Sequence, residues 1–94
     1  MDIALRKDDQ AQRYELLVDG RLASYTEWFD DGDRVVMPHT VTIPAFRGQG
    51  LAAQVVRFAL DDLATRATLV VPACWFVADF IEQHPEYQAL VAPA

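Results

Sequence analysis

The chain contains 94 residues, of which 52% are hydrophobic, so it can form one small domain with a real core and has no room for a second. Its 14 acidic and 8 basic side chains give a net charge of −6, which argues against the clustered positive charge that nucleic acid binding requires. The single cysteine, Cys74, cannot form an internal disulfide, and we find neither a signal peptide nor the roughly 18 consecutive apolar residues that span a membrane. We therefore expect a cytoplasmic protein with no membrane partner.

The first half of the chain predicts antiparallel strands. Residues 13–29 read as two strands around Asp19-Gly20, a dipeptide that type I′ hairpin turns favour because both central residues need positive φ. Residues 3–7 predict a short edge strand. A second turn, at residues 30–33, leads into the β-branched stretch 34–43, a predicted strand in which Pro38 lacks an N–H and favours a bulge or an edge position.

After Gly50 the hydrophobic period changes to about 3.6 residues, which predicts an amphipathic helix over residues 50–66. Phe58 falls on the polar half of this helix, where we expect an exposed aromatic side chain. The short apolar run 68–72 predicts a strand that is buried on both faces. Residues 75–83 predict a second helix, which ends at His84-Pro85. Strand 34–43, helix 50–66 and strand 68–72 then form a βαβ unit.

Acidic residues are concentrated near the start of the chain. This distribution is compatible with a cationic substrate such as an amine, and the simpler interpretation is a solvated acidic face. The sequence DDGD at residues 30–33 lacks the alternating oxygen ligands of a calcium loop, so we predict a turn there and no metal site. Nine acids precede residue 34: Asp2, Asp8, Asp9, Glu15, Asp19, Glu27, Asp30, Asp31 and Asp33.

The stretch FRGQGLAA, residues 46–53, joins a predicted strand to a predicted helix through two glycines. Such a junction presents free backbone N–H groups and the positive end of a helix dipole, which together suit a phosphate. A Walker loop is excluded because no lysine is near. The dinucleotide pattern fits Gly48, Gly50 and Ala53, but no acidic residue follows the next strand to hold a ribose.

A third pattern, R/Q-x-x-G-x-G/A, fits Arg47, Gly50 and Ala52 and resembles the acetyl-CoA pyrophosphate loop of the GNAT acyltransferase superfamily. Residues 39–87 look like the very short single-domain GNAT-like group sometimes called the YjdJ type. That group carries an H-T strand, an RGxG turn, a strand-end cysteine and a terminal HPEY. The resemblance implies a minimal GNAT-like α/β (α+β) fold over residues 1–94, with a mostly antiparallel sheet of N-terminal strands, a βαβ unit and a C-terminal helix.

The resemblance also implies acetyl-CoA, or CoA, as the cofactor. The backbone amides of residues 48–53 would bind the pyrophosphate, and strand 39–43 would run beside the pantetheine arm and orient the thioester carbonyl. A helix whose N-terminus is capped by turn glycines, with no ligand, is the alternative. The cofactor-binding residues predicted in this way are Thr40, Val41, Ile43, Arg47, Gly48, Gln49, Gly50, Leu51, Ala52 and Ala53.

Acetyl transfer to an amine needs a proton acceptor and a group that protonates the departing thiolate. His39 is the candidate base, because an imidazole titrates near neutral pH. Strict alternation would nevertheless place it with Val35 and Met37 on the core face, unless a bulge near Pro38 changes that face. Cys74 precedes a predicted helix, whose N-terminus favours a thiolate and permits an acetyl-cysteine, although cysteine is often a small buried apolar residue.

Many GNAT enzymes use a tyrosine from the last helix as the general acid. Here Phe80 stands where we would look for it, and Trp75 replaces the proline expected after Cys74. We interpret Tyr87 as a packing anchor near the C-terminus. We predict an N-acetyltransferase acting on a small or lysine-like amine. An acetyl-CoA-binding module with little or no transferase activity is the alternative, and a scaffold without a ligand is a third hypothesis.

Overall fold

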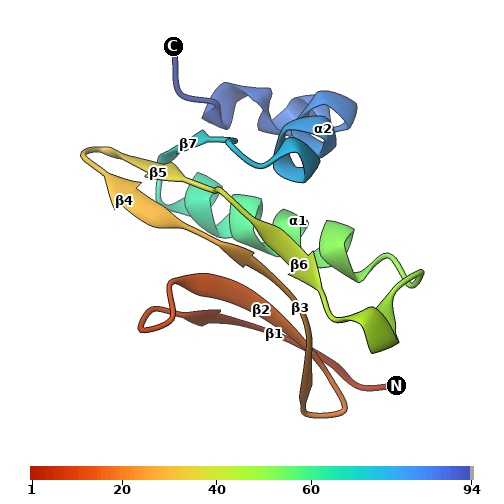
Figure 1. Ribbon diagram of the computed structural model, residues 1–94. Helices are drawn as coiled ribbons and strands as arrows, with labels where there is room; N and C mark the ends of the chain where they lie inside the picture. The colour runs from red at the N-terminus through yellow and green to blue at the C-terminus, as the bar shows by residue number, and fades with distance from the viewer. Residues whose placement is uncertain (94) are drawn as a thin grey trace.

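The fold was analysed in a computed structural model that describes residues 1–93. Seven strands, two α-helices and two short 3-10 helices follow one another along this range (Figure 1). The strands form a four-stranded sheet in the order β1-β2-β3-β6 and a three-stranded sheet in the order β4-β5-β7. The elements are β1 (Ile3–Asp8), β2 (Arg13–Val18), β3 (Arg21–Glu27), β4 (Phe29–Asp31), β5 (Arg34–Val36), β6 (Thr40–Thr42), η1 (Pro44–Phe46), α1 (Leu51–Thr65), β7 (Leu69–Val71), α2 (Trp75–Gln83) and η2 (Pro85–Leu90).

The predicted hairpins are present. β2 and β3 pair antiparallel around Asp19 and Gly20, which both have positive φ, as a type I′ turn requires. β1 pairs along its whole length with β2, so the expected edge strand exists. A second hairpin joins β4 to β5 around Gly32, whose φ is +68°. The sequence therefore predicted the turns at residues 19–20 and 30–33, whereas the turn at residues 9–12, which joins β1 to β2, was not predicted.

The predicted strand 34–43 is divided in two by a bulge at Pro38. Glu27 pairs with His39 through a backbone hydrogen bond, and Phe29 pairs with Val36. Trp28 alone therefore faces both Met37 and Pro38, which is the two-against-one count of a β-bulge. The extra residue inverts the alternation of side chains beyond it. Of the two alternatives for His39, strict alternation therefore does not hold and the bulge near Pro38 does change its face: the side chain of His39 is 72% exposed.

The two sheets separate where this bulge lies. β5 pairs with β7 in parallel, which confirms the predicted βαβ unit, and the N–H of Met37 still donates to the carbonyl of Val71 (3.0 Å). Beyond Met37 the chain leaves β7, and within residues 1–93 β6 pairs only with β3 and forms the edge of its sheet. Figure 1 shows β5 and β7 side by side while β6 runs away from them. β6 and β7 therefore diverge, and we call the region between β6 and the start of α2 the wedge.

Helix α1 packs on one face of the four-stranded sheet. Its buried side chains meet those of β2 and β3, and the Tyr14 hydroxyl donates to the Asp62 carboxylate (2.7 Å). Phe58, expected to be exposed, is instead partly buried and meets the Tyr14 ring edge-on. The hydrophobic period of the helix did not predict this position, because Tyr14 of β2 and Leu5 of β1 lie on the same side of the helix as Phe58. The most deeply buried apolar residues are Leu16, Ala23, Met37, Val55, Val56, Ala59, Leu60, Val70 and Val77.

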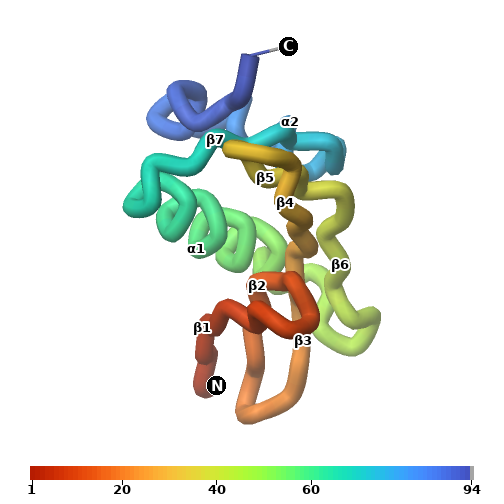
Figure 2. The backbone as a smooth tube through the Cα atoms, turned by 90° about the vertical axis from the view of Figure 1, so that its left-hand side faces the viewer, coloured from red at the N-terminus to blue at the C-terminus, as the bar shows by residue number. Residues whose placement is uncertain are grey.

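The chain ends by folding back against β7. Helix α2 stops at His84, as His84-Pro85 predicted, and the 3-10 turn η2 then buries Tyr87. The Tyr87 hydroxyl donates to Asp61 (2.6 Å) and accepts from Arg57 (3.1 Å), both on α1, so the predicted packing anchor is confirmed. The N–H of Ala92 reaches the carbonyl of Val70, and Figure 2 shows the two termini at opposite ends of the molecule. Within residues 1–93, no helix is long and apolar enough to cross a membrane.

Candidate functional site

The glycine junction forms a tight loop that ends on the open N-terminus of α1. Gly48 and Gly50 have φ values of +82° and +71°, a region that side chains with a Cβ rarely adopt. Gly50 is the N-cap of α1, and no side chain caps the helix there. The first turn carries no acidic residue, and Arg47 is exposed beside it. The loop therefore offers free N–H groups and a positive charge to an anion.

A hollow of about 290 Å³ lies directly against this loop. Six of the predicted cofactor-binding residues line it: Arg47, Gly48, Gly50, Leu51, Ala52 and Ala53. Three further residues were missed from the sequence, namely Thr42 on β6, Phe46 on η1 and Phe76 on α2. The geometry thus joins the loop, the edge strand and the second helix into one concave surface.

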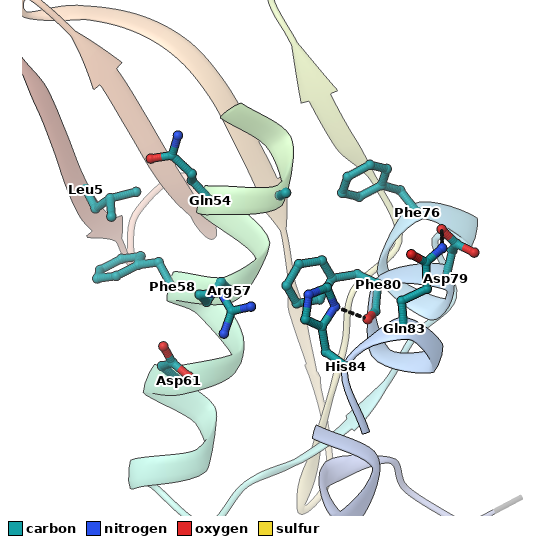
Figure 3. A pocket seen from close by; sticks show the side chains of 11 residues that line it. Leu5, Gln54, Arg57, Phe58, Asp61, Phe76, Asp79, Phe80, Gln83 and His84 are labelled. Carbon is teal, nitrogen blue, oxygen red and sulfur yellow. Dashed lines mark hydrogen bonds between the residues drawn. The ribbon is translucent and has the colours of Figure 1, made fainter. Parts of the chain in front are cut away.

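A larger hollow of about 520 Å³ lies between α1 and α2 and shares Ala53 and Phe76 with the first. The two hollows adjoin at these two residues, and we refer to them together as the groove. Figure 3 shows side chains of α1 and α2 facing each other across it, with Leu5 of β1 at one side. From α1 come Gln54, Arg57, Phe58 and Asp61, and from α2 and its end come Phe76, Asp79, Phe80, Gln83 and His84.

The α2 wall of this groove was not predicted. Phe76 and Phe80 are four residues apart on the helix and form its apolar part, and this spacing was the available signal. Phe80 is buried and stacks on the His84 ring, with ring centroids 4.0 Å apart. Phe80 therefore supplies a flat apolar surface where a tyrosine hydroxyl was sought.

Cys74 lies in the wedge between β6 and α2. It is the N-cap of α2, its backbone N–H donates to the Met37 carbonyl (2.9 Å), and its side chain is buried. The thiol donates to the hydroxyl of Thr40, with Sγ and Oγ1 3.6 Å apart. Thr40 Oγ1 in turn lies 3.0 Å from Thr26 Oγ1, and Thr26 donates to the His39 carbonyl (3.4 Å). A chain of hydroxyl groups therefore connects the thiol to β3.

His39 lies on the opposite face of the sheet from Cys74. Thr40 pairs with Thr26, and Thr26 pairs with Tyr14, so the three side chains lie on one face of the sheet. This is the face that α1 covers, because Tyr14 contacts Asp62 of α1, and Cys74 lies on it because its thiol contacts Thr40. The His39 ring instead meets Glu27, with Nδ1 and Oε1 3.0 Å apart. The structure therefore does not bring the two catalytic candidates together, and each has its own side of β6.

The other predicted cofactor residues take different positions. Val41 pairs with Tyr25 and points to the same face as His39, while its carbonyl accepts from the Ser24 hydroxyl (2.9 Å). The N–H of Ile43 donates to the carbonyl of Ala23 (2.8 Å), so it is engaged within the sheet. Gln49 is exposed and lines neither hollow. Within residues 1–93, no cluster of three or more His, Cys, Asp or Glu side chains could hold a metal ion.

Two solved structures share this fold. One is the ribosomal-protein-S18-alanine N-acetyltransferase from Escherichia coli, with a TM-score of 0.61 and 18% identity over 78% of this chain and 50% of that one. The other is the ribosomal-protein-alanine N-acetyltransferase from Brucella melitensis biovar Abortus 2308, with a TM-score of 0.57 and 19% identity over 94% of this chain and 68% of that one. At such identities the likeness establishes the α+β fold of acetyltransferases.

Sequence comparison identifies the family. Residues 13–90 match the model of the GCN5-related N-acetyltransferases, and the chain belongs to that family. The chain is also similar to the protein NATD1 of Bos taurus, with 32% identity over 60 residues; this aligned stretch covers 63% of the chain. The chain spans about half, 53%, of the length of that relative. The narrower resemblance to the YjdJ type stays a prediction.

Proposed function

We propose that the chain is an acetyl-CoA-dependent N-acetyltransferase that acts on an amine. The observation that carries the proposal is the uncapped N-terminus of α1, which opens through two positive-φ glycines onto a groove walled by the edge strand β6 and by α2. Membership of the GCN5-related N-acetyltransferase family supports the same function.

The residues of the loop fit the diphosphate part of acetyl-CoA. The amides of residues 48–53 and the Arg47 guanidinium are donors, and a glycine backbone lets an anion approach closely. The edge of β6 offers backbone groups to an extended amide-containing arm. The apolar walls of Phe76 and Phe80, with the polar side chains of α1 at the rim, continue the same groove toward the ends of the helices.

Acetyl-CoA would supply an activated thioester, and two candidate groups of this chain flank β6. His39, whose side chain is exposed, would accept a proton from an amine that approaches from solvent. Cys74, on the buried face at the start of α2, would either protonate a leaving thiolate or accept the acetyl group itself. From these two positions we infer that acetyl-CoA and the amine approach β6 from opposite faces of the sheet.

Isothermal titration with acetyl-CoA tests the binding step, and a transfer assay over a panel of amines, including lysine and lysine-containing peptides, tests the reaction. We expect saturable binding together with the release of CoA that depends on an amine. Binding without such release would favour the alternative function, an acetyl-CoA-binding module. The absence of any heat or thermal shift at millimolar acetyl-CoA would overturn the proposal.

A further inference from the structure

We propose that Glu27 is a positioning residue for His39, which it holds on the open face of the sheet with Nε2 left as the free proton acceptor. The inference rests on the proposed function, because it names the residue that orients the base of that reaction. Glu27 ends β3, and His39 follows the bulge that turns its side chain away from the core.

The backbone brings these two side chains together. The N–H of Glu27 donates to the carbonyl of His39 (2.8 Å), and the Thr26 hydroxyl donates to the same carbonyl (3.4 Å). This register places Glu27 Oε1 3.0 Å from His39 Nδ1. Pro38, which has a fixed φ, precedes His39 at the bulge. The backbone of His39 is held by its pairing with Glu27 at the end of β3, and this pairing sets the position of the imidazole.

The contact selects one form of the imidazole ring. An ionised carboxylate can only accept a hydrogen bond, so Nδ1 must carry the hydrogen that it receives. In the neutral ring the lone pair is then on Nε2, which points away from Glu27. The His39 side chain is 72% exposed and that of Glu27 is 41% exposed, so Nε2 remains within reach of a substrate.

The role in transfer follows from the proton balance. An acceptor ammonium gives one proton to His39 Nε2 and becomes a neutral amine. The amine nitrogen forms a bond to the thioester carbonyl carbon as the carbon–sulfur bond breaks, and its second proton ends on the CoA thiol. The carboxylate of Glu27 takes no proton. It holds the hydrogen on Nδ1, and so it keeps the lone pair of Nε2 directed away from Glu27.

The tautomer is measured by 15N spectroscopy of the two histidine rings, which distinguishes a protonated ring nitrogen from an unprotonated one. We expect neutral His39 to carry its hydrogen on Nδ1 in the wild-type protein and to show a mixture in Glu27→Gln, because a carboxamide can donate or accept. His84 is the internal reference, since its Nδ1 faces the Phe80 carbonyl (2.7 Å), which also only accepts. A His39 spectrum that Glu27→Gln leaves unchanged would overturn the inference, whether or not the protein transfers acetyl groups.

The kinetic arm asks whether Glu27 acts through His39. We expect Glu27→Gln to lower kcat about threefold to tenfold, as for a partly exposed charge pair, without a change in KM for acetyl-CoA or in the thermal midpoint. In a His39→Gln background the same substitution should have no further effect. Asp30→Asn, an exposed carboxylate on β4, is the matched control and should retain full activity. Equal losses in both backgrounds would show that Glu27 does not act through His39.

These outcomes separate the inference from the proposed function. A wild-type protein that binds no acetyl-CoA and transfers nothing would refute the proposed function, and the ring spectra would still decide the role of Glu27 in holding His39. A wild-type protein that transfers acetyl groups, with Glu27→Gln fully active, would keep the function and refute the inference.

Discussion

The sulfur of Cys74 lies 3.6 Å from the hydroxyl oxygen of Thr40, in the wedge where β6 leaves β7. The Thr26 hydroxyl donates to the His39 carbonyl, so Thr40 donates to Thr26 and accepts from the thiol. Each group in this series therefore donates to the next one, from the Cys74 thiol through Thr40 and Thr26 to the His39 carbonyl. If the thiol loses its proton, the Thr40 hydroxyl can turn and donate to the sulfur instead. Cys74 thus has a polar partner in a position that is otherwise buried.

Replacing Cys74 tests whether this thiol takes part in transfer. We expect Cys74→Ala to bind acetyl-CoA as the wild-type protein does and to transfer the acetyl group at least about tenfold more slowly, because a proton donor or nucleophile is lost. Titration calorimetry and the transfer assay measure the two steps. Mass spectrometry after incubation with acetyl-CoA shows whether an acetyl adduct forms and disappears in the variant. Turnover that Cys74→Ala leaves unaffected would remove this residue from the mechanism.

Substitution of Gly50 tests the proposed binding of the acetyl-CoA diphosphate at the start of α1. We expect Gly50→Asp to weaken acetyl-CoA binding at least about tenfold, because its carboxylate would face the diphosphate at the positive end of the helix. Gly50→Asn is the matched control, since asparagine tolerates a positive φ equally well and carries no charge. Calorimetric titration of both variants separates charge from backbone strain. Equal affinities of the two variants would place the diphosphate elsewhere.

The anchor at Tyr87 makes a prediction about stability. Burial and the hydrogen bond to Asp61 raise the pKa of Tyr87, so the hydroxyl stays protonated and keeps donating across the neutral range. We expect Tyr87→Phe to lower the free energy of unfolding by about 1 kcal/mol, because Asp61 and Arg57 on α1 lose their shared partner. Urea denaturation measures this loss. Tyr25→Phe is the control and should change stability by less than about 0.5 kcal/mol, since phenylalanine keeps the ring that stacks on Arg13.

The buried carboxylate of Glu15 predicts a loss of stability in acid. Burial alone would raise the pKa of Glu15, but hydrogen bonds from Arg13 and Arg6 outweigh it and hold the pKa below its ordinary value. A lowered pKa in the folded state contributes stability that is present above the ordinary glutamate range, about 4.3, and is lost as the pH falls through the folded value. We expect Glu15→Gln to cost about 2 kcal/mol at pH 7 and to flatten the decline below about pH 4.5.

Urea unfolding at a series of pH values measures both effects. Asp62 adds a decline of the same sign, because hydrogen bonds from Tyr14 and Arg66 lower the pKa of Asp62 against the opposing effect of burial. Asp62→Asn in the same series separates the two contributions. An acid decline in Glu15→Gln as steep as in the wild-type protein would show that Glu15 is not the group that titrates.

The sequence by itself determined the local structure and the loop. Asp19-Gly20 specified a hairpin because few residues accept two successive positive φ values, and the hydrophobic period of residues 51–65 specified a helix with one buried face. The glycines after Arg47 specified an open helix start, because glycine has no Cβ and readily adopts the positive φ that this loop requires. These features involve residues close together in the chain, so neighbouring residues are enough to predict them.

The tertiary structure alone decided which side chains meet. Pro38 indicated a bulge, but only the pairing of Trp28 against Met37 and Pro38 placed His39 beside Glu27 and away from Cys74. The α2 wall of the groove likewise depends on where Phe76 and Phe80 come to lie against α1. Such contacts join segments that are distant in the chain, and a shift of one residue in strand register would exchange the two faces of β6. For that reason the conformation of the glycine loop at residues 46–53 could be predicted from the residues, whereas the arrangement of the candidate catalytic groups required the fold.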